Sequence, residues 1–161
     1  MKPHKLLTLF LLMGVCYMAT EVVYNAFTPF SFALVGTSSI WMGAVGGALG
    51  VLLGELSPGG SILPPSSLYA LRVLVGGTAI NLIELVAGLI LNKALNLGIW
   101  DYSVYPLNIA GQVCAHHAVI WYLFTPFVFW LDDVMRFYLY QGCRPLPLRR
   151  YYSMVLSRVR Y

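Results

Sequence analysis

Long apolar runs alternate along the chain with short connections rich in Pro, Gly and Ser. A helix that crosses a bilayer needs about 20 predominantly apolar residues. Four runs reach that length, at about 6–27, 35–56, 71–94 and 113–131. The pattern therefore predicts an all-α protein with a bundle of four transmembrane helices. A lid loop over 95–112 joins the last two runs, and a basic tail covers 134–161.

The composition places this bundle in a membrane. Apolar residues make up 59% of the chain and charged residues 10%, against roughly 45–50% and about 25% in soluble domains. So few charges cannot cover a water-exposed surface, which indicates an integral membrane protein. The length of 161 residues predicts a single membrane domain, 1–161.

The positions of the basic residues predict the orientation. Of the 10 Lys and Arg residues, all but Lys93 lie before the first run, at the start of the third, or after the fourth. Because positive charge concentrates in cytoplasmic segments, we expect both termini in the cytoplasm, a multi-pass protein of the cell membrane and a lid that faces outward. The net charge of +4 follows from this topology, so we expect no nucleic-acid partner. The first run resembles a signal peptide but lacks a clean cleavage site, and we interpret it as a span.

The tail repeats apolar residues at helical spacing with arginines between them. This pattern is typical of an amphipathic helix at an interface, and the cytoplasmic leaflet is anionic. We therefore predict a lipid-binding helix that uses Arg149, Arg150, Arg158 and Arg160. The alternative is a basic tail without stable structure.

Glycines repeat at helical spacing in the second run, at Gly43, Gly47, Gly50 and Gly54. Small residues on one face let another backbone approach closely. The stripe indicates either tight packing within the bundle or a mobile or dimeric interface.

The third run carries one polar face, formed by Gly77, Asn81, Glu84, Gly88 and Asn92. Steps of three and four residues place these side chains on the same side of a helix. The first run adds Glu21 and Asn25 in its outward half. A carboxylate in hydrocarbon costs about 3 kcal/mol on insertion scales, so these glutamates must face the interior. There they either form hydrogen bonds between helices or line a polar cavity that binds a solute or a proton.

The lid is the most polar connection in the chain, and five of its residues are candidates for that site: Trp100, Asp101, Tyr102, Asn108 and Gln112. At membrane depth, the N–H and C=O groups of its irregular backbone must form hydrogen bonds with protein or water. We predict that Asp101 fixes the lid by capping a short turn or by accepting bonds from loop N–H groups.

Cys114, His116 and His117 are adjacent, yet zinc sites need about four ligands at recognisable spacing. We expect uncharged histidines, with no metal and no cofactor. Near the cytoplasmic side, Glu55 meets either water or Arg72, while Asp132 and Asp133 meet either water or Arg136. No phosphate-binding loop is present, which excludes ATP hydrolysis by that route.

Three segments resemble a known family. They are "ELVAGLILNKALNLGIWDYSVYPLNIAGQVC" from Glu84 to Cys114, "TSSIWMGAVGG" from Thr37 to Gly47, and Glu21-x-x-Tyr24-Asn25. They are similar to the small bacterial membrane proteins labelled putative ABC-transporter type IV, or CmpB-like permease, and to a related animal family of small multi-span proteins. The resemblance implies a permease-like component. Because four spans are few for a permease, we expect a homo-oligomer or a subunit of a larger assembly.

Three functions are compatible with these features. The first is a transport-related component whose polar site is formed by the first and third spans. The second is a non-transporting subunit, lipid-binding protein or sensor whose glutamates are structural. The third, and least supported, is an intramembrane enzyme that uses Asp101, His116 and His117 for acid–base chemistry.

Overall fold

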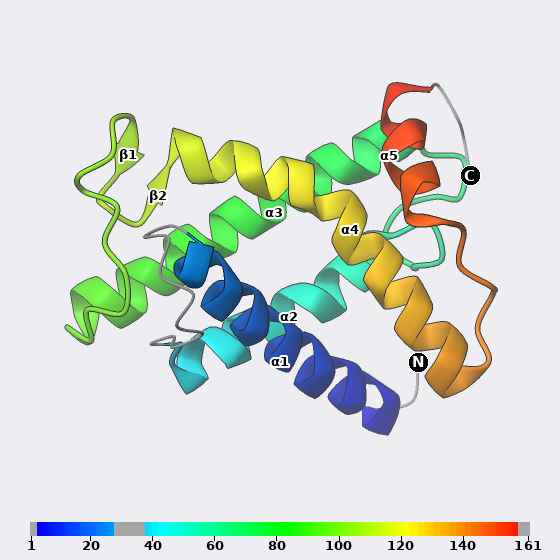
Figure 1. The fold of residues 1–161 in the computed structure, drawn as a ribbon, viewed down its shortest axis with the longest axis horizontal. Coiled ribbons are helices and arrows are strands. Elements are labelled where there is room, and N and C mark those ends of the chain that lie inside the picture. The colour runs from blue at the N-terminus through cyan, green and yellow to red at the C-terminus, as the bar shows by residue number, and fades with distance from the viewer. Residues whose placement is uncertain (1–2, 28–37, 158–161) are drawn as a thin grey trace. The chain divides into compact units, whose positions relative to one another are not determined.

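The structure is a computed structural model, and it describes residues 3–27 and 38–157, apart from the side chains of 24–27 (Figure 1). The chain divides into two compact units, Met1–Val51 and Leu52–Tyr161, and each is described by itself. The prediction of a single membrane domain over the whole chain stays a prediction.

The first unit contains α1 (Pro3–Phe27) and most of α2 (Ile40–Leu56). Glycines bring the two helices into contact: a Cβ added at Gly14 would lie 2.5 Å from the carbonyl oxygen of Gly43, and one at Gly47 would lie 2.5 Å from that of Phe10. Gly50 contacts the side chain of Met13. The predicted tight packing of this stripe is therefore confirmed from Gly43 to Gly50, while an interface between copies is not tested.

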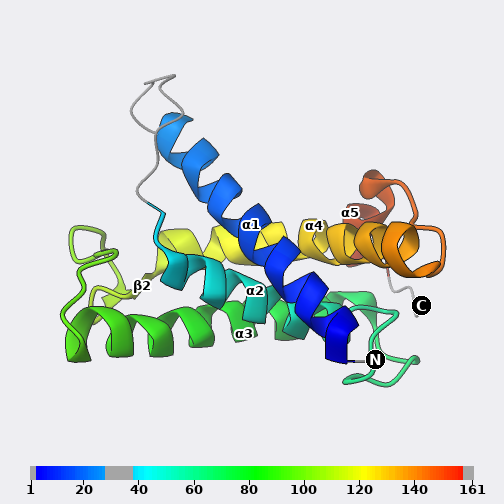
Figure 2. The same cartoon turned by 90° about the horizontal axis from the view of Figure 1, so that it is seen from below.

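The second unit holds α3 (Tyr69–Gly88), which continues as the π-helical turn η1 (Leu89–Ala94). An irregular lid leads to two short antiparallel strands, β1 (Asn108–Ile109) and β2 (Val113–Cys114). Then follow α4 (Ala115–Tyr140) and α5 (Leu148–Leu156). α3 and α4 are in contact and cross one another in Figure 1, with the lid toward one end and α5 toward the other (Figures 1 and 2).

Small residues on α3 let α4 approach closely. Gly76 contacts Thr125 and Gly77 contacts the ring of Tyr122. Toward α5, the fully buried Phe129 meets Tyr69 edge-on, with ring centroids 6.0 Å apart. Tyr151 of α5 packs against the same Tyr69 at 6.4 Å. The core of this unit therefore joins α3, α4 and α5.

Three segments of the described residues are long and apolar enough to cross a membrane: Pro3–Val23, Tyr69–Ala94 and Ala115–Tyr140. The second predicted run forms α2, a shorter apolar helix of 17 residues. The membrane class is thus supported, whereas the count of four spans stays a prediction. The helix α4 continues past the predicted end of the last run at 131, to Tyr140, and its C-cap Gln141 takes a left-handed φ of 56°. The position at which the span leaves the membrane stays a prediction.

Candidate functional site

Glu84 joins α3 to both α4 and the lid. Only 5% of the residue's surface is exposed. The hydroxyl of Tyr102, in the lid, donates to Oε1 at 3.2 Å. The indole Nε1 of Trp121, in α4, donates to Oε2 at 2.9 Å. A carboxylate needs such donors when it is removed from water, and here both are electrically neutral.

Asn92 and Gln112 anchor the lid to the end of α3. Asn92 Nδ2 donates to Gln112 Oε1 at 2.7 Å and to the carbonyl of Trp100 at 3.0 Å, and Asn92 Oδ1 accepts from the N–H of Ile99 at 2.7 Å. The indole of Trp100 donates to the carbonyl of Gln112 at 3.1 Å. Asn92 lies in η1, and π-turns of this kind often occur at functional sites. We name one set of residues the lid cluster: Glu84, Asn92, Trp100, Tyr102, Gln112 and Trp121.

The predicted polar face of α3 is turned toward α4 and the lid. Gly77 contacts Tyr122, and a Cβ added at Gly88 would lie 2.5 Å from Gln112 Oε1. Asn81 Nδ2 donates to the carbonyl of Gly77 at 2.8 Å. Asn81 Oδ1 is buried and accepts no hydrogen bond from the described residues. The face is therefore inward, as the glycine and amide spacing predicted.

Asp101 shapes the lid from within. Its Oδ1 accepts the N–H of Ser103 at 2.8 Å, a local turn in which a side chain replaces a backbone acceptor. This bond stabilises the charged form and holds the pKa of Asp101 below its ordinary value. The predicted role of Asp101 in fixing the loop is confirmed.

Asn108 makes further internal contacts of the lid. Its Nδ2 donates to the carbonyls of Ser103 at 3.3 Å and Tyr105 at 2.8 Å, and its Oδ1 accepts from the N–H of Gly111 at 3.0 Å. Ala110 and Gly111 have positive φ of 53° and 71°, within the three residues that join β1 to β2. Asn108 thus holds the hairpin and the loop in one shape.

The histidines of α4 pack against lid tyrosines. The ring of His117 stacks on Tyr102 at 4.3 Å, and His117 Nδ1 lies 3.1 Å from Cys114 Sγ. His116 stacks on Tyr105 at 6.2 Å. In the described part of the chain, no group of three or more His, Cys, Asp or Glu could hold a metal ion. Sequence reasoning missed this aromatic contact, since no local pattern links the lid tyrosines to the histidines.

The predicted residues of the first span belong to the other unit. There the hydroxyl of Ser38 donates to Glu21 Oε2 at 2.6 Å. The side chain of Asn25 lies outside the described residues. Participation of Glu21 and Asn25 in a polar site therefore stays a prediction.

A second polar cluster lies at the opposite end of α4. Arg136 Nε donates to Asp132 Oδ2 at 2.6 Å, and Arg136 Nη2 lies 3.2 Å from Glu55 Oε1. The hydroxyl of Tyr151, in α5, donates to Asp133 Oδ2 at 2.6 Å. We name these residues the arginine cluster: Glu55, Asp132, Asp133, Arg136 and Tyr151.

The contacts of the arginine cluster show which of the predicted partners Asp132 and Glu55 have. Asp132 has 0% of its surface exposed, so its pairing with Arg136 is confirmed and its placement in water is wrong. Pairing of Glu55 with Arg72 is also wrong. Arg72 is fully buried and donates instead to four carbonyls of the connection before α3, those of Leu56, Ser57, Leu63 and Pro64.

A family model described as "Putative ABC-transporter type IV" matches residues 5–156. The match includes the lid segment that carries the resemblance noted in the sequence, and it runs through α5. The chain belongs to this family. Searches of the curated proteins and of the solved structures found no match.

Membership of the family described as "Putative ABC-transporter type IV" supports a membrane protein related to transport, in agreement with the three long apolar helices among the described residues. In this family member, the conspicuous lid segment is the one that Asn92 and Gln112 attach to α3. Its Trp-Asp-Tyr-Ser sequence supplies the carbonyl bound by Asn92, the Asp101 turn and the hydroxyl on Glu84.

The arginines predicted to bind lipid lie on or beyond α5. Arg149 and Arg150 are exposed on this helix, while Arg158 and Arg160 lie outside the described residues. Tyr151 and Met154, on the other face of α5, are buried against the unit. Part of the amphipathic pattern therefore serves protein packing, and the interfacial position of α5 stays a prediction.

Proposed function

We propose that this chain is a permease-like membrane component whose polar site is centred on Glu84 and closed by the lid. One observation carries the proposal: the Glu84 carboxylate accepts hydrogen bonds from the lid through Tyr102 and from α4 through Trp121. A buried acidic residue inside a membrane-crossing helix is costly and is typically functional. The family description supports transport as the context.

Neutral donors make this contact reversible. A solute with hydrogen-bond donors, or a proton, can replace the Tyr102 hydroxyl without leaving a fixed charge behind. Hydrogen bonds to an ionised carboxylate are about twice as strong as those to a neutral group. Protonation of Glu84 therefore weakens the hold of Tyr102 and favours release of the lid, while Asn92 and Gln112 keep its base attached to α3.

The wider arrangement in this proposal has four spans, both termini in the cytoplasm and an outward lid. Glu21, Asn25, Asn81, Trp100, Asp101, Asn108 and Gln112 complete the set of proposed site residues. The basic tail meets anionic lipid, and the chain acts as a homo-oligomer or as a subunit of a larger assembly. Topology reporters at each connection would test the orientation.

Proton flux into proteoliposomes containing a trapped pH-sensitive dye tests the proposal directly. We expect Glu84→Gln to abolish flux driven by a membrane potential, because glutamine cannot gain or lose a proton. Glu55→Gln is the matched control, since it removes a carboxylate at the far end of the unit. Equal flux in wild type and in a correctly folded Glu84→Gln protein would refute the proposed role.

A second candidate is a non-transporting subunit in which Glu84 is structural. The same two bonds favour it, because they occupy both carboxylate oxygens with protein donors. Co-purification from membranes separates the two functions. A stoichiometric protein partner together with no flux would support the subunit, whereas flux from the isolated chain would support the permease.

A further inference from the structure

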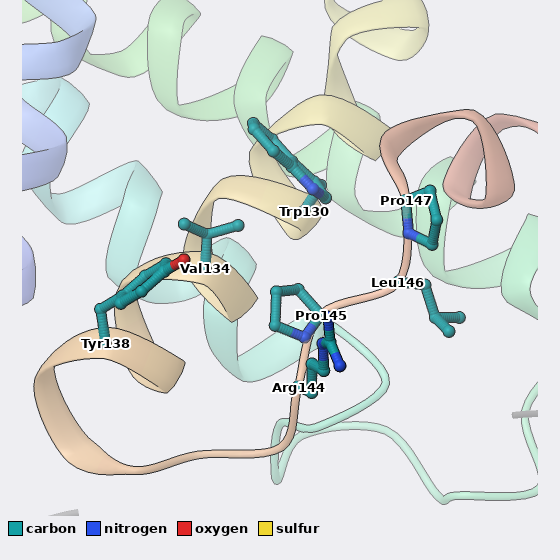
Figure 3. A pocket seen from close by; sticks show the side chains of 7 residues that line it. All are labelled: Trp130, Val134, Tyr138, Arg144, Pro145, Leu146 and Pro147. Carbon is teal, nitrogen blue, oxygen red and sulfur yellow. The ribbon is translucent and has the colours of Figure 1, made fainter.

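The second half of α4 forms one wall of an open groove of about 760 Å³ (Figure 3). Trp130, Val134 and Tyr138 follow one another at steps of four residues, so they share one face of the helix. The opposite wall is the extended segment Arg144–Pro147. Figure 3 shows this segment passing alongside α4 before it enters α5.

The sequence explains why the segment returns along α4 in an extended form. Gln141 ends α4 in a left-handed conformation, with φ of 56°, which redirects the chain. Pro145 and Pro147 then exclude a helix and provide no N–H donors. The segment Arg144–Pro147 therefore lines the groove mainly with two proline rings and Leu146, and it offers few polar groups beside Arg144.

Arg144 supplies the positive charge of this groove. It is exposed and lines the groove with the two prolines. Both ion pairs found among the described residues involve Arg136 rather than Arg144. A guanidinium beside an aromatic and aliphatic wall fits a ligand with a negatively charged head and an apolar chain.

We propose that the Arg144 groove binds one anionic phospholipid, with its phosphate on Arg144 and the start of an acyl chain on Trp130, Val134 and Tyr138. Arginine pairs with phosphate through two parallel hydrogen bonds. Tryptophan and tyrosine suit the boundary between headgroups and hydrocarbon. From Trp130 to Tyr138 the helix rises about 12 Å, enough for the glycerol and the first part of a chain.

The surroundings favour a lipid over a peptide. α4 is apolar and long enough to cross a membrane, so its outward face meets lipid. A peptide that bound as an extended strand would need backbone N–H donors from the groove, and Pro145 and Pro147 have none. This site is distinct from leaflet attraction by the predicted tail arginines, because neither Arg149 nor Arg150 lines the groove.

Native mass spectrometry of the detergent-purified chain, with added dioleoyl phosphatidylglycerol or dioleoyl phosphatidylcholine, tests the site. We expect one phosphatidylglycerol to remain bound under conditions that remove phosphatidylcholine. Arg144→Gln should weaken retention about fivefold, the effect of one arginine near an anionic headgroup. Val134→Trp keeps every charge but fills the groove, and it should weaken retention at least as much.

Arg149→Gln removes the same charge from the predicted lipid-binding tail, outside the groove, and we expect it to weaken retention clearly less than Arg144→Gln does. Circular dichroism checks that each variant folds. Equal weakening by Arg144→Gln and Arg149→Gln would overturn the proposal in favour of general attraction to the basic tail. Unchanged retention in folded Val134→Trp, or equal binding of both lipids, would also overturn it. None of these readouts depends on flux.

Discussion

The lid cluster and the arginine cluster are two buried polar groups toward opposite ends of α4, yet they balance charge differently. In the lid cluster, the donors that Glu84 receives from the described residues are neutral and come from Tyr102 and Trp121. In the arginine cluster, the fully buried Asp132 meets the guanidinium of Arg136 at 2.6 Å. Glu55 shares that cation, and Tyr151 adds a bond from α5 to Asp133.

Because of this difference, we expect the contacts of the lid cluster to break more easily than those of the arginine cluster. Removal of one partner from a buried ion pair leaves an uncompensated charge, which is strongly destabilising. Removal of a neutral donor leaves one unmet hydrogen bond, a smaller loss. We therefore expect the contact between the lid and Glu84 to break at a lower cost than the arginine cluster, which joins α4 and α5 to the end of α2.

The largest effect should come from Arg136→Gln, which leaves Asp132 and Glu55 without their cation. We expect the free energy of unfolding in mixed micelles to fall by about 3 kcal/mol. Adding Asp132→Asn in the same chain should recover part of this loss, since it removes the unpaired carboxylate. Arg149→Gln, on the exposed face of α5, should change little. A loss from Arg136→Gln as small as that control would show that the cluster does not lock this end.

The next largest effect should be a difference in stability between Glu84→Leu and Glu84→Gln. Leucine removes the carboxylate oxygen that accepts from the Trp121 N–H, which can only donate, and should cost about 2 kcal/mol. Glutamine can accept from Trp121 through its oxygen and donate to the Tyr102 hydroxyl, so it should cost less than half as much. Unfolding of both variants in the same micelles measures this. Equal losses would contradict the geometry around Glu84.

Tyr151→Phe should have a smaller effect, about 1.5 kcal/mol, because it removes one hydrogen bond to a carboxylate and keeps the buried ring. The loss should be local, with faster proteolysis or hydrogen exchange in α5 and unchanged exchange in the lid. Tyr152→Phe, an exposed neighbour on the same helix, is the control. Exchange that rises equally in both variants would argue against the Tyr151–Asp133 bond.

The smallest effect should be the pH response of the lid turn. Asp101 has a pKa below its ordinary value of 3.8 because it accepts the Ser103 N–H. Its stabilisation is therefore present above that value and is lost as the pH falls through the lowered pKa. We expect protection of the Ser103 amide against hydrogen exchange to drop only below about pH 3.8. Asp101→Asn keeps the acceptor oxygen but does not titrate, so its protection should stay constant with pH.

Much of the lid cluster was predictable because periodicity reports which side of a helix is polar. The spacing of Asn81, Glu84 and Asn92 gave the inward face of α3, and the polarity of the lid pointed to Asp101, Tyr102 and Gln112. The partners of Glu84 could not be predicted completely. Trp121 lies 37 residues away, and any of several aromatic side chains on α4 could have faced Glu84 until the packing of Gly77 on Tyr122 set the rotation of the helix.

The partners in the arginine cluster were also only partly predictable from the sequence. The spacing of Asp132 and Arg136 by four residues allowed their pairing, because such residues are neighbours on a helix. Nothing in the sequence linked Glu55 to Arg136, or Tyr151 to Asp133, which lie 81 and 18 positions apart. The extent of α4 beyond 131 was also missed, since two adjacent aspartates resemble the end of a span until their partners are known.

By itself, the sequence determined the membrane class, the polar face of α3, the turn made by Asp101 and the membership of the family, because these depend on composition and on neighbours along one element. Tertiary structure alone decided which buried charge met which donor. That choice depends on the rotation and depth of helices packed through glycines, and on the energetic need to satisfy each buried polar group with whatever side chain the packing brings within reach.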